Sequence, residues 1–240
     1  MAGGDGSFAA VAAVAVGRDL PLVCIPFGTR NHFARDLGID RDDPVAALAA
    51  FHGRERRIDV GAVGDRLFLN NVSLGLYASF VHDPVPKTRN RLMAFLRMAP
   101  AALGRGRSPL DVSFELEGRR KRHAALVVLV ANNDYRIESM ADLGERARLD
   151  EGLLHAYVIE AVSRRALLAL LARAAVGKVG EAQGLVEWAA ECFSVKSSRA
   201  RIHAAIDGEP VVLETPLEFE VRPGALRVLV PPSGAQGGVE

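Results

Sequence analysis

The sequence predicts an α/β fold followed by a mostly-β fold: an incomplete N-terminal α/β lobe and a larger antiparallel β-sandwich-like domain. Two glycine turns, each leading into a helical pattern, occupy the first part of the chain, and no strand is predicted before the first turn. Short strand patterns separated by turn residues then continue almost to the end. We therefore divide the chain into a partial lobe over 1–56, a β-rich domain over 57–231 and a flexible tail over 232–240.

The N-terminal lobe begins directly with a glycine turn over 3–6. Helices are predicted over 7–16, 31–37 and 43–51, because each run ends at a glycine or starts near a proline or capping residue. The short apolar run 20–25 has the pattern of a buried parallel strand. These elements give the strand–turn–helix order that is typical of an α/β lobe.

Strand patterns dominate the second part of the chain. The alternation in 112–116 and 124–131, with Glu117 and Gly118 between them, predicts a hairpin. Helices are predicted over 92–103 and 164–176. Further strands are predicted at 58–60, 66–72, 153–159, 193–196, 201–206, 217–221 and 226–230.

Composition excludes several classes of protein. The net charge of +1 provides no field that would attract nucleic acid. The two cysteines have no metal-site or disulfide spacing, so we expect a reducing compartment and a buried Cys24. No apolar run approaches the ~20 residues that span a bilayer, and no signal peptide is apparent. We therefore expect a cytoplasmic protein that is at most peripheral to the inner face of the membrane.

The two glycine turns are candidate phosphate-binding sites. Glycines allow the backbone N–H groups to approach a phosphate closely, and a helix that starts there adds the positive end of its dipole. A plain turn, or an N-cap without a ligand, is the alternative for each. The candidate residues are Gly3, Gly4, Asp5 and Gly6 in the first turn and Gly28, Thr29 and Asn31 in the second.

Two acidic pairs complete the candidate site. Asp150 and Glu151 are adjacent carboxylates before a strand, a pattern that suits Mg²⁺, and a solvated acidic turn is the alternative. Asp207 and Glu209 flank Gly208 in a pattern that also predicts a plain hairpin turn. In the functional interpretation Asp207 accepts a proton from an attacking hydroxyl, and Glu209 supports it or a metal.

These motifs, taken in order, resemble those of the diacylglycerol kinase and sphingosine kinase family, which is related in fold to the NAD kinases. The resemblance covers 3 to about 231. Its motifs are Gly-Gly-Asp-Gly-Ser from Gly3, Pro-Phe-Gly-Thr-Arg-Asn-His-Phe-Ala from Pro26, Phe68-x-Asn70 with Gly75, Leu-Asp-Glu-Gly-Leu from Leu149, and Asp-Gly-Glu from Asp207.

The resemblance implies an ATP-dependent lipid kinase that uses Mg²⁺. It implies that Gly3, Gly4, Asp5 and Gly6 form the nucleotide-phosphate loop and that Gly28, Thr29 and Asn31 form the second nucleotide turn. It also implies that Asp150 and Glu151 bind metal and that Asp207 and Glu209 are the catalytic acidic pair. The implied partner is a diacylglycerol-like or sphingoid lipid at a membrane surface, and a homodimer remains open.

The sequence departs from the family pattern at several positions, namely Arg30, His32, Tyr77 and Glu151. His32 stands where many members have a carboxylate, and it cannot replace one as a ligand for Mg²⁺. Family members also carry further elements before the first glycine loop, so we expect an N-terminally truncated chain. Two alternatives therefore stay open: an NAD-kinase-like enzyme with a soluble hydroxyl acceptor, and a degenerate nucleotide- or lipid-binding domain without catalysis.

Overall fold

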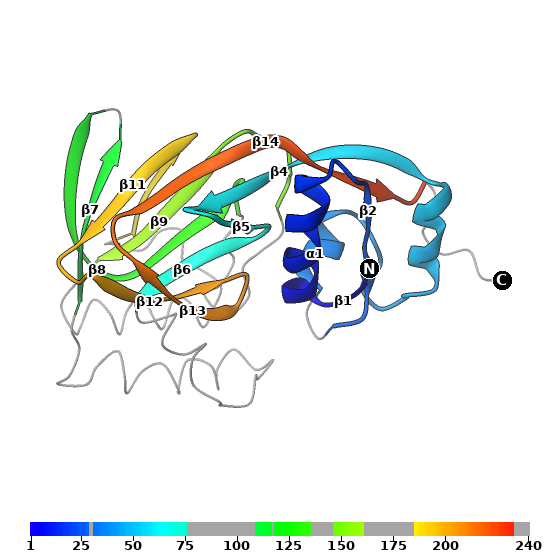
Figure 1. Cartoon of the computed structure of the whole chain (residues 1–240), viewed down its shortest axis with the longest axis horizontal. Helices are drawn as coiled ribbons and strands as arrows, with labels where there is room; N and C mark the ends of the chain where they lie inside the picture. Colours follow the sequence, from blue (N-terminus) through cyan, green and yellow to red (C-terminus); the bar gives the residue numbers. More distant parts are fainter. Residues whose placement is uncertain (29–30, 76–108, 117, 136–145, 161–184, 233–240) are drawn as a thin grey trace.

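The computed structural model describes residues 1–28, 31–75, 109–116, 118–135, 146–160 and 185–232. The predicted helices over 92–103 and 164–176 lie outside these residues. Figure 1 shows a small lobe that contains the helices beside a larger lobe of strands. The predicted fold class, an α/β lobe joined to a larger antiparallel β domain, is confirmed. Among the described residues, no helix has the length and apolar character needed to cross a membrane.

The small lobe has helices packed beside short parallel strands. The 2-stranded sheet pairs β1 with β3 in parallel, with Gly3 opposite Pro26. The prediction that no strand precedes the first glycine turn was therefore wrong, because Ala2 and Gly3 form β1, which leads into the turn. The elements are β1 (Ala2–Gly3), α1 (Asp5–Gly17), β2 (Leu22–Val23), β3 (Ile25–Pro26), α2 (His32–Asp36) and the 3-10 helix η1 (Ala46–His52).

The large lobe is a curled sheet of mostly antiparallel strands. Its central path runs β13-β12-β6-β8-β7-β11-β14-β4-β5, and β9 and β10 extend from β8. The strands are β4 (Arg54–Val63), β5 (Arg66–Phe68), β6 (Asn71–Gly75), β7 (Leu110–Leu116), β8 (Arg119–Asn132), β9 (Leu154–Glu160), β10 (Leu185–Ala190), β11 (Cys192–Ser197), β12 (Arg201–Ile206), β13 (Glu209–Glu214) and β14 (Leu217–Val230).

Strands β4 and β14 run through both lobes (Figure 1). The start of β14 pairs with β11 in the large lobe, whereas Val228 and Leu229 near its end pair in parallel with Leu22 and Val23 of β2. Strand β4 follows β14 along almost its whole length, with a register shift between Arg222 and Leu226. Strand β14, the last strand of the described residues, is therefore also part of the small lobe.

Each lobe has its own apolar core. Phe68, Val128 and Phe219 are among the fully buried side chains of the large lobe. The core of the small lobe combines Phe8 and Phe33 of its helices with side chains of β4 and β14. The prediction of a buried Cys24 is confirmed, since it is 0% exposed and burial raises the pKa of its thiol to about 12.

Several predicted elements differ in detail. The predicted helix 43–51 is the 3-10 helix η1, and the predicted strand 66–72 is two strands, β5 and β6. The predicted strands 217–221 and 226–230 are one strand, β14, interrupted by a bulge. Strands β10 and β13 were not predicted, because β10 lacks strict alternation and β13 contains Pro210, which normally marks a strand edge.

Candidate functional site

The two glycine turns meet at one end of the small sheet. They follow β1 and β3, and the parallel pairing of these strands brings the turns together at the same edge. A Cβ atom on Gly28 would lie 2.5 Å from the Cα of Gly4, a separation that real Cβ atoms do not show. The close approach therefore requires a glycine at position 28. It places the backbones of the two turns side by side.

Asn31 holds the second turn in shape. Its Nδ2 donates to the Gly28 carbonyl oxygen at 3.0 Å, and its Oδ1 accepts from the Gly28 N–H at 2.9 Å. The residue is 4% exposed and has a φ of 50°, in the left-handed region that asparagine tolerates. The amide of Asn31 is thus engaged by the turn itself, and its contact with a nucleotide stays a prediction. Thr29 and Arg30 lie outside the described residues.

Asp5 joins the first turn to the second helix. Its carboxylate accepts from the backbone N–H groups of His32 at 3.2 Å and Phe33 at 2.9 Å, so it caps α2 and not its own helix. Gly4 is the N-cap of α1, and no side chain in the described part of the chain caps that end. The first N–H groups of α1 are consequently available to an anion.

The acidic hairpin reaches the first glycine turn. Asp207 and Gly208 both have positive φ, of 48° and 84°, and form the tight turn between β12 and β13. A Cβ atom on Gly6 would lie 2.8 Å from Oε1 of Glu209. The fold therefore brings the exposed Glu209 carboxylate against the first turn of α1. The first glycine turn and the Asp-Gly-Glu hairpin thus lie close enough to belong to one site.

Asp207 itself is buried and fully engaged with the backbone. Its Oδ1 accepts from the N–H groups of Asn70 at 2.7 Å and Asn71 at 3.0 Å, and its Oδ2 accepts from the N–H of Leu69 at 2.8 Å. Burial raises its pKa to about 6, while these three N–H donors and the nearby Arg146 oppose that rise. Asp207 therefore fixes the segment between β5 and β6.

Asp150 and Glu151 have different partners. The Asp150 carboxylate pairs with Arg148 at 3.1 Å on the surface. Oε2 of Glu151 accepts from the N–H of Asp134 at 3.2 Å and lies 3.2 Å from Nε2 of His155. The two carboxylates share none of these partners, so their joint binding of one metal ion stays a prediction.

Arg146 is a buried residue that the sequence analysis did not assign, and it contacts α2 and the segment between β5 and β6. The Arg146 guanidinium donates to Asp36 Oδ2 at 2.7 Å and Asn70 Oδ1 at 2.8 Å. It also donates to the carbonyl oxygens of Leu69 at 2.6 Å and Asn132 at 3.1 Å. Nothing in the sequence distinguishes it from the exposed Arg148 two residues later, because burial is a property of the fold.

Asp59 is a second buried group that the sequence analysis did not assign. Its carboxylate accepts from Gly152 N–H at 2.7 Å and Gly224 N–H at 2.9 Å, and the residue is 3% exposed. Asp59, on β4, is thereby hydrogen-bonded both to the turn before β9 and to the bulge in β14. A charged residue between Ile58 and Val60, inside an apolar strand, was the available signal.

These features define a two-lobed fold. An α/β lobe with two glycine turns is joined by the long strands β4 and β14 to an antiparallel β-sandwich, and the acidic hairpin of the sandwich reaches the first glycine turn. The model of the diacylglycerol kinase catalytic domain matches residues 1–63, and that of the YegS C-terminal NAD kinase beta sandwich-like domain matches residues 72–230. The chain belongs to the diacylglycerol kinase and YegS-like lipid kinase family.

Relatives and solved structures agree with this family. A Pseudomonas fluorescens protein named Probable lipid kinase YegS-like is 31% identical over 95% of this chain and 76% of its own length. A Mycobacterium tuberculosis protein named Diacylglycerol kinase is 28% identical over 98% of this chain and 77% of its own length. A crystal structure of a Bacillus anthracis diacylglycerol kinase has the same fold, with a TM-score of 0.70, 18% identity and coverage of 95% of this chain and 76% of its own.

Proposed function

We propose that this chain transfers the γ-phosphate of ATP to the hydroxyl group of a lipid, with a diacylglycerol-like lipid as the preferred acceptor. The observation that carries the proposal is the contact between Glu209 and Gly6, which brings an acidic group to a glycine turn at the start of a helix. The family, and a relative named Diacylglycerol kinase, support the lipid acceptor.

The phosphates of ATP would bind where the two glycine turns meet. Backbone N–H groups at the uncapped start of α1 supply hydrogen bonds and the positive end of the helix dipole. Gly4 and Gly28 leave no side chain between the ligand and the backbone. Positioning and electrostatic stabilisation are the main contributions that a protein makes to phosphoryl transfer.

Glu209 is the better-placed of the two acidic residues to face the reacting phosphate. It is exposed and lies against Gly6, whereas Asp207 is buried and accepts three backbone hydrogen bonds. The sequence hypothesis assigned the proton acceptor to Asp207. The geometry favours Glu209 as the group that takes the hydroxyl proton, and Asp207 as the residue that positions the hairpin.

Mg²⁺ is usually held by one or two carboxylates together with substrate phosphates, and Glu209 would fill this role only in place of accepting the proton, since a metal-bound carboxylate is a weaker base. Mg²⁺ would neutralise negative charge on the phosphates. Asp150 and Glu151 fit this role less well, because they are engaged with Arg148 and His155.

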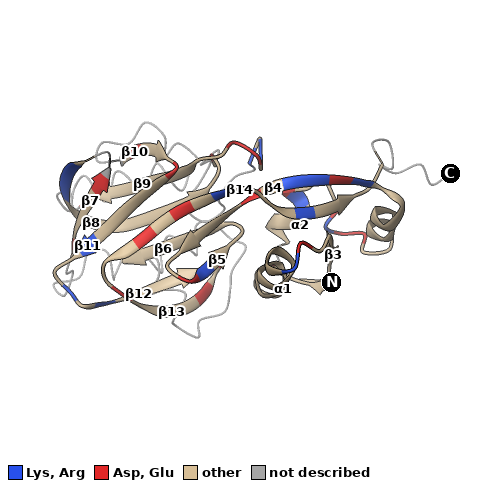
Figure 2. Ribbon diagram, turned by 45° about the horizontal axis from the view of Figure 1, so that its top comes forward, with Lys and Arg blue, Asp and Glu red and all other residues tan. Residues whose placement is uncertain are grey.

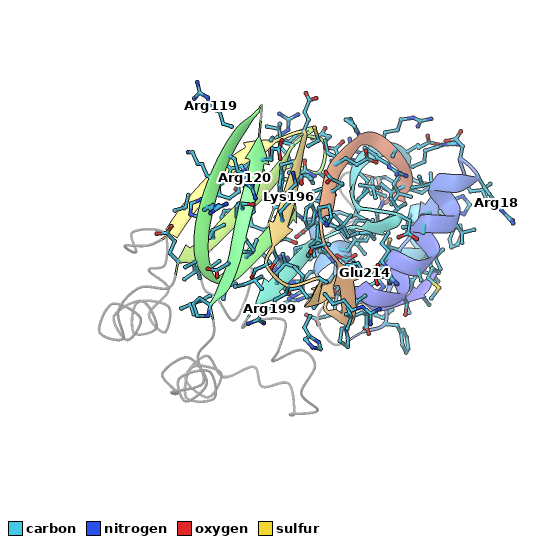
Figure 3. The ribbon with its side chains drawn as sticks, turned by 60° about the vertical axis from the view of Figure 1, so that its left-hand side comes forward. Arg18, Arg119, Arg120, Lys196, Arg199 and Glu214 are labelled. Atoms are coloured by element: carbon cyan, nitrogen blue, oxygen red, sulfur yellow. The ribbon has the colours of Figure 1, made fainter. Side chains whose placement is uncertain are left out.

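The lipid would be reached at a membrane surface. Four consecutive basic residues at the start of β8 are exposed, and Figure 3 shows Arg119 and Arg120 extending from this end of the β7–β8 hairpin. Basic residues near an anionic bilayer contribute about 1 kcal/mol each to attraction. The proposed contact region comprises Arg119, Arg120, Lys121 and Arg122, which alternate between the two faces of the hairpin near its tip.

The test is a phosphorylation assay with the full chain, labelled ATP and Mg²⁺, on vesicles that contain diacylglycerol or sphingosine in neutral or anionic lipid. NAD is the soluble acceptor in a parallel reaction. We expect labelled lipid from diacylglycerol, with more product on anionic vesicles. Glu209→Gln should lower kcat by about 100-fold or more, as for loss of a general base.

Glu214→Gln is the matched control, because Glu214 is an exposed carboxylate at the other end of β13. It should leave the rate unchanged. Both variants should unfold at the urea concentration of the unmodified chain, since each side chain is exposed. Phosphorylated NAD without phosphorylated lipid would support the soluble-acceptor alternative. No product from a folded chain that still binds ATP would support a non-catalytic domain.

A further inference from the structure

Three potential metal ligands meet on neighbouring strands away from the glycine turns. Asp134 follows the end of β8, His155 is on β9 and Glu187 is on β10. His155 pairs across the strands with Ala189, so Glu187 is its diagonal neighbour on the same face of the sheet. One ligand atom from each of the three residues lies within 4.8 Å of the other two.

The imidazole of His155 supplies an unused ligand atom at the centre of this cluster. The residue is only 8% exposed, and its Nδ1 is buried without a hydrogen-bond partner in the described part of the structure. This atom lies 3.7 Å from Oδ1 of Asp134 and 3.7 Å from Oε1 of Glu187. A ring nitrogen thus faces two carboxylates, at distances too long for direct hydrogen bonds.

Glu151 determines which ring nitrogen carries the proton. Its Oε2 lies 3.2 Å from Nε2 of His155, and a carboxylate can only accept, so this hydrogen bond needs the proton on Nε2. With the proton on Nε2, Nδ1 presents its lone pair to Asp134 and Glu187. A cation between this nitrogen and the two carboxylates, either a metal ion or a second ring proton, would offset their repulsion.

Tyr157 holds the first carboxylate in place. Its hydroxyl donates to Oδ1 of Asp134 at 2.7 Å and accepts the N–H of Tyr135 at 3.2 Å. The ring of Tyr157 also stacks near that of His155, with ring centroids 6.3 Å apart. Metal-binding residues are commonly oriented by such partners, and a carboxylate on the far nitrogen of a ligating histidine is the usual one.

We propose that Asp134, His155 and Glu187 bind a divalent transition-metal ion, with Glu151 and Tyr157 as positioning residues. One imidazole nitrogen and two carboxylate oxygens suit Zn²⁺ or Mn²⁺ better than Mg²⁺, which prefers oxygen alone. Ligand atoms at about 2.1 Å from a tetrahedral ion are about 3.4 Å apart, close to the 3.7 Å found here. The half-exposed carboxylates leave room for water as a further ligand. The site goes beyond the proposed kinase function, which uses none of its three ligands.

The test is calorimetric titration of the EDTA-treated and desalted full chain with Zn²⁺, accompanied by ¹⁵N spectra of the histidine rings. We expect one Zn²⁺ per chain and a zinc-dependent shift of the Nδ1 signal of one histidine, with its Nε2 still protonated. Asp134→Asn and Glu187→Gln should each weaken binding about tenfold or more, and Glu151→Gln by a similar factor. His155→Gln should abolish both binding and the shifted signal.

Glu220→Gln is the control, because Glu220 is an exposed carboxylate on β14 with an exposed fraction similar to that of Glu187. It should bind Zn²⁺ as the unmodified chain does. Asp134 and Glu187 are about half exposed, so their variants should remain folded. Unchanged affinity in both of these variants, a shift at another histidine, or no binding by the folded chain would overturn the proposal. The readouts are independent of kinase activity.

Discussion

At the scale of single residues, Asp207 shows how one buried carboxylate organises a site. It lies in a hairpin turn but accepts hydrogen bonds from three consecutive N–H groups of a different segment, Leu69 to Asn71. Its own N–H donates to the Asn71 carbonyl oxygen at 2.9 Å. Because the same hairpin carries Glu209, the position of the exposed acidic group depends on the buried one.

We predict that Asp207→Ala lowers the free energy of unfolding by about 2–3 kcal/mol at neutral pH, since three backbone donors lose their acceptor. Urea denaturation measures this change. The effect would also move Glu209, so lost activity in this variant would not identify the base, whereas Glu209→Gln does. A wild-type denaturation midpoint in Asp207→Ala would contradict the structural role.

The stability effect of Asp207 should depend on pH. Its pKa is raised in the folded chain from 3.8 to about 6, so the folded state holds the proton more tightly than the unfolded state. The contribution of the carboxyl to stability is therefore greatest below about pH 4 and declines as the pH rises to about 6. The penalty of Asp207→Ala should be larger at pH 4.5 than at pH 7.5 in paired urea titrations. The opposite trend would mean that the N–H donors outweigh burial.

At the scale of elements, the glycine turns owe their proximity to two very short strands. β1 and β3 contribute two residues each, yet their parallel register brings Gly4 beside Gly28. Asp5 of the first turn then caps α2, so the start of the second helix is bonded to the first turn. A site built in this way is sensitive to any side chain added between the turns.

We predict that Gly28→Ala weakens ATP binding about tenfold or more, because the new Cβ would meet Gly4 Cα at 2.5 Å and Asn31 Oδ1 at 2.7 Å. Calorimetric titration with a non-hydrolysable ATP analogue measures the affinity. Gly17→Ala is the control, since a Cβ there meets nothing within 4 Å. Equal affinity in the two variants would show that nucleotide does not bind between the turns.

At the scale of the whole molecule, β4, β14 and Arg146 hold the two lobes together. Arg146 bonds to Asp36 of α2 in the small lobe and to Asn70 and Asn132 beside the large sheet. In Figure 2, β4 and β14 run side by side from one lobe into the other, carrying basic and acidic residues along the connecting part. Both side chains of the Arg146–Asp36 pair are 0% exposed.

We predict that Arg146→Met lowers the free energy of unfolding by about 3–5 kcal/mol, because Oδ2 of the buried Asp36 carboxylate loses its donor and only Arg35, among the described residues, still pairs with Oδ1. The double variant Arg146→Met with Asp36→Asn should recover part of this loss. Arg148→Met is the control: its side chain is 65% exposed and its removal should change stability by less than about 0.5 kcal/mol. Equal stabilities of Arg146→Met and Arg148→Met would rule out this joining role.

The sequence predicted the local elements best where a pattern lies within a few neighbouring residues. The 201–206 strand, the hairpin around Gly118 and the Asp207–Gly208 turn follow from alternation and turn chemistry, which are local effects. Element ends were less exact, as in η1 and in the division between β5 and β6, because tertiary packing sets them.

The residues that hold the site in place were not predictable in the same way. Arg146 and Arg148 look alike in the sequence, but only Arg146 meets Asp36, because burial depends on which segments pack around it. Similarly, Asn31 and Asp5 were expected to face a ligand. In the structure, Asn31 forms hydrogen bonds with Gly28 in its own turn, and Asp5 caps α2.

The fold class, the family and the order of motifs that define the candidate site can be predicted from local patterns along the chain. The return of β14 to the small lobe, the approach of Glu209 to Gly6 and the position of His155 beside Asp134 and Glu187 are apparent only in the folded molecule. These contacts join residues far apart in the chain, and strand register and side-chain burial fix them only when the whole sheet has formed.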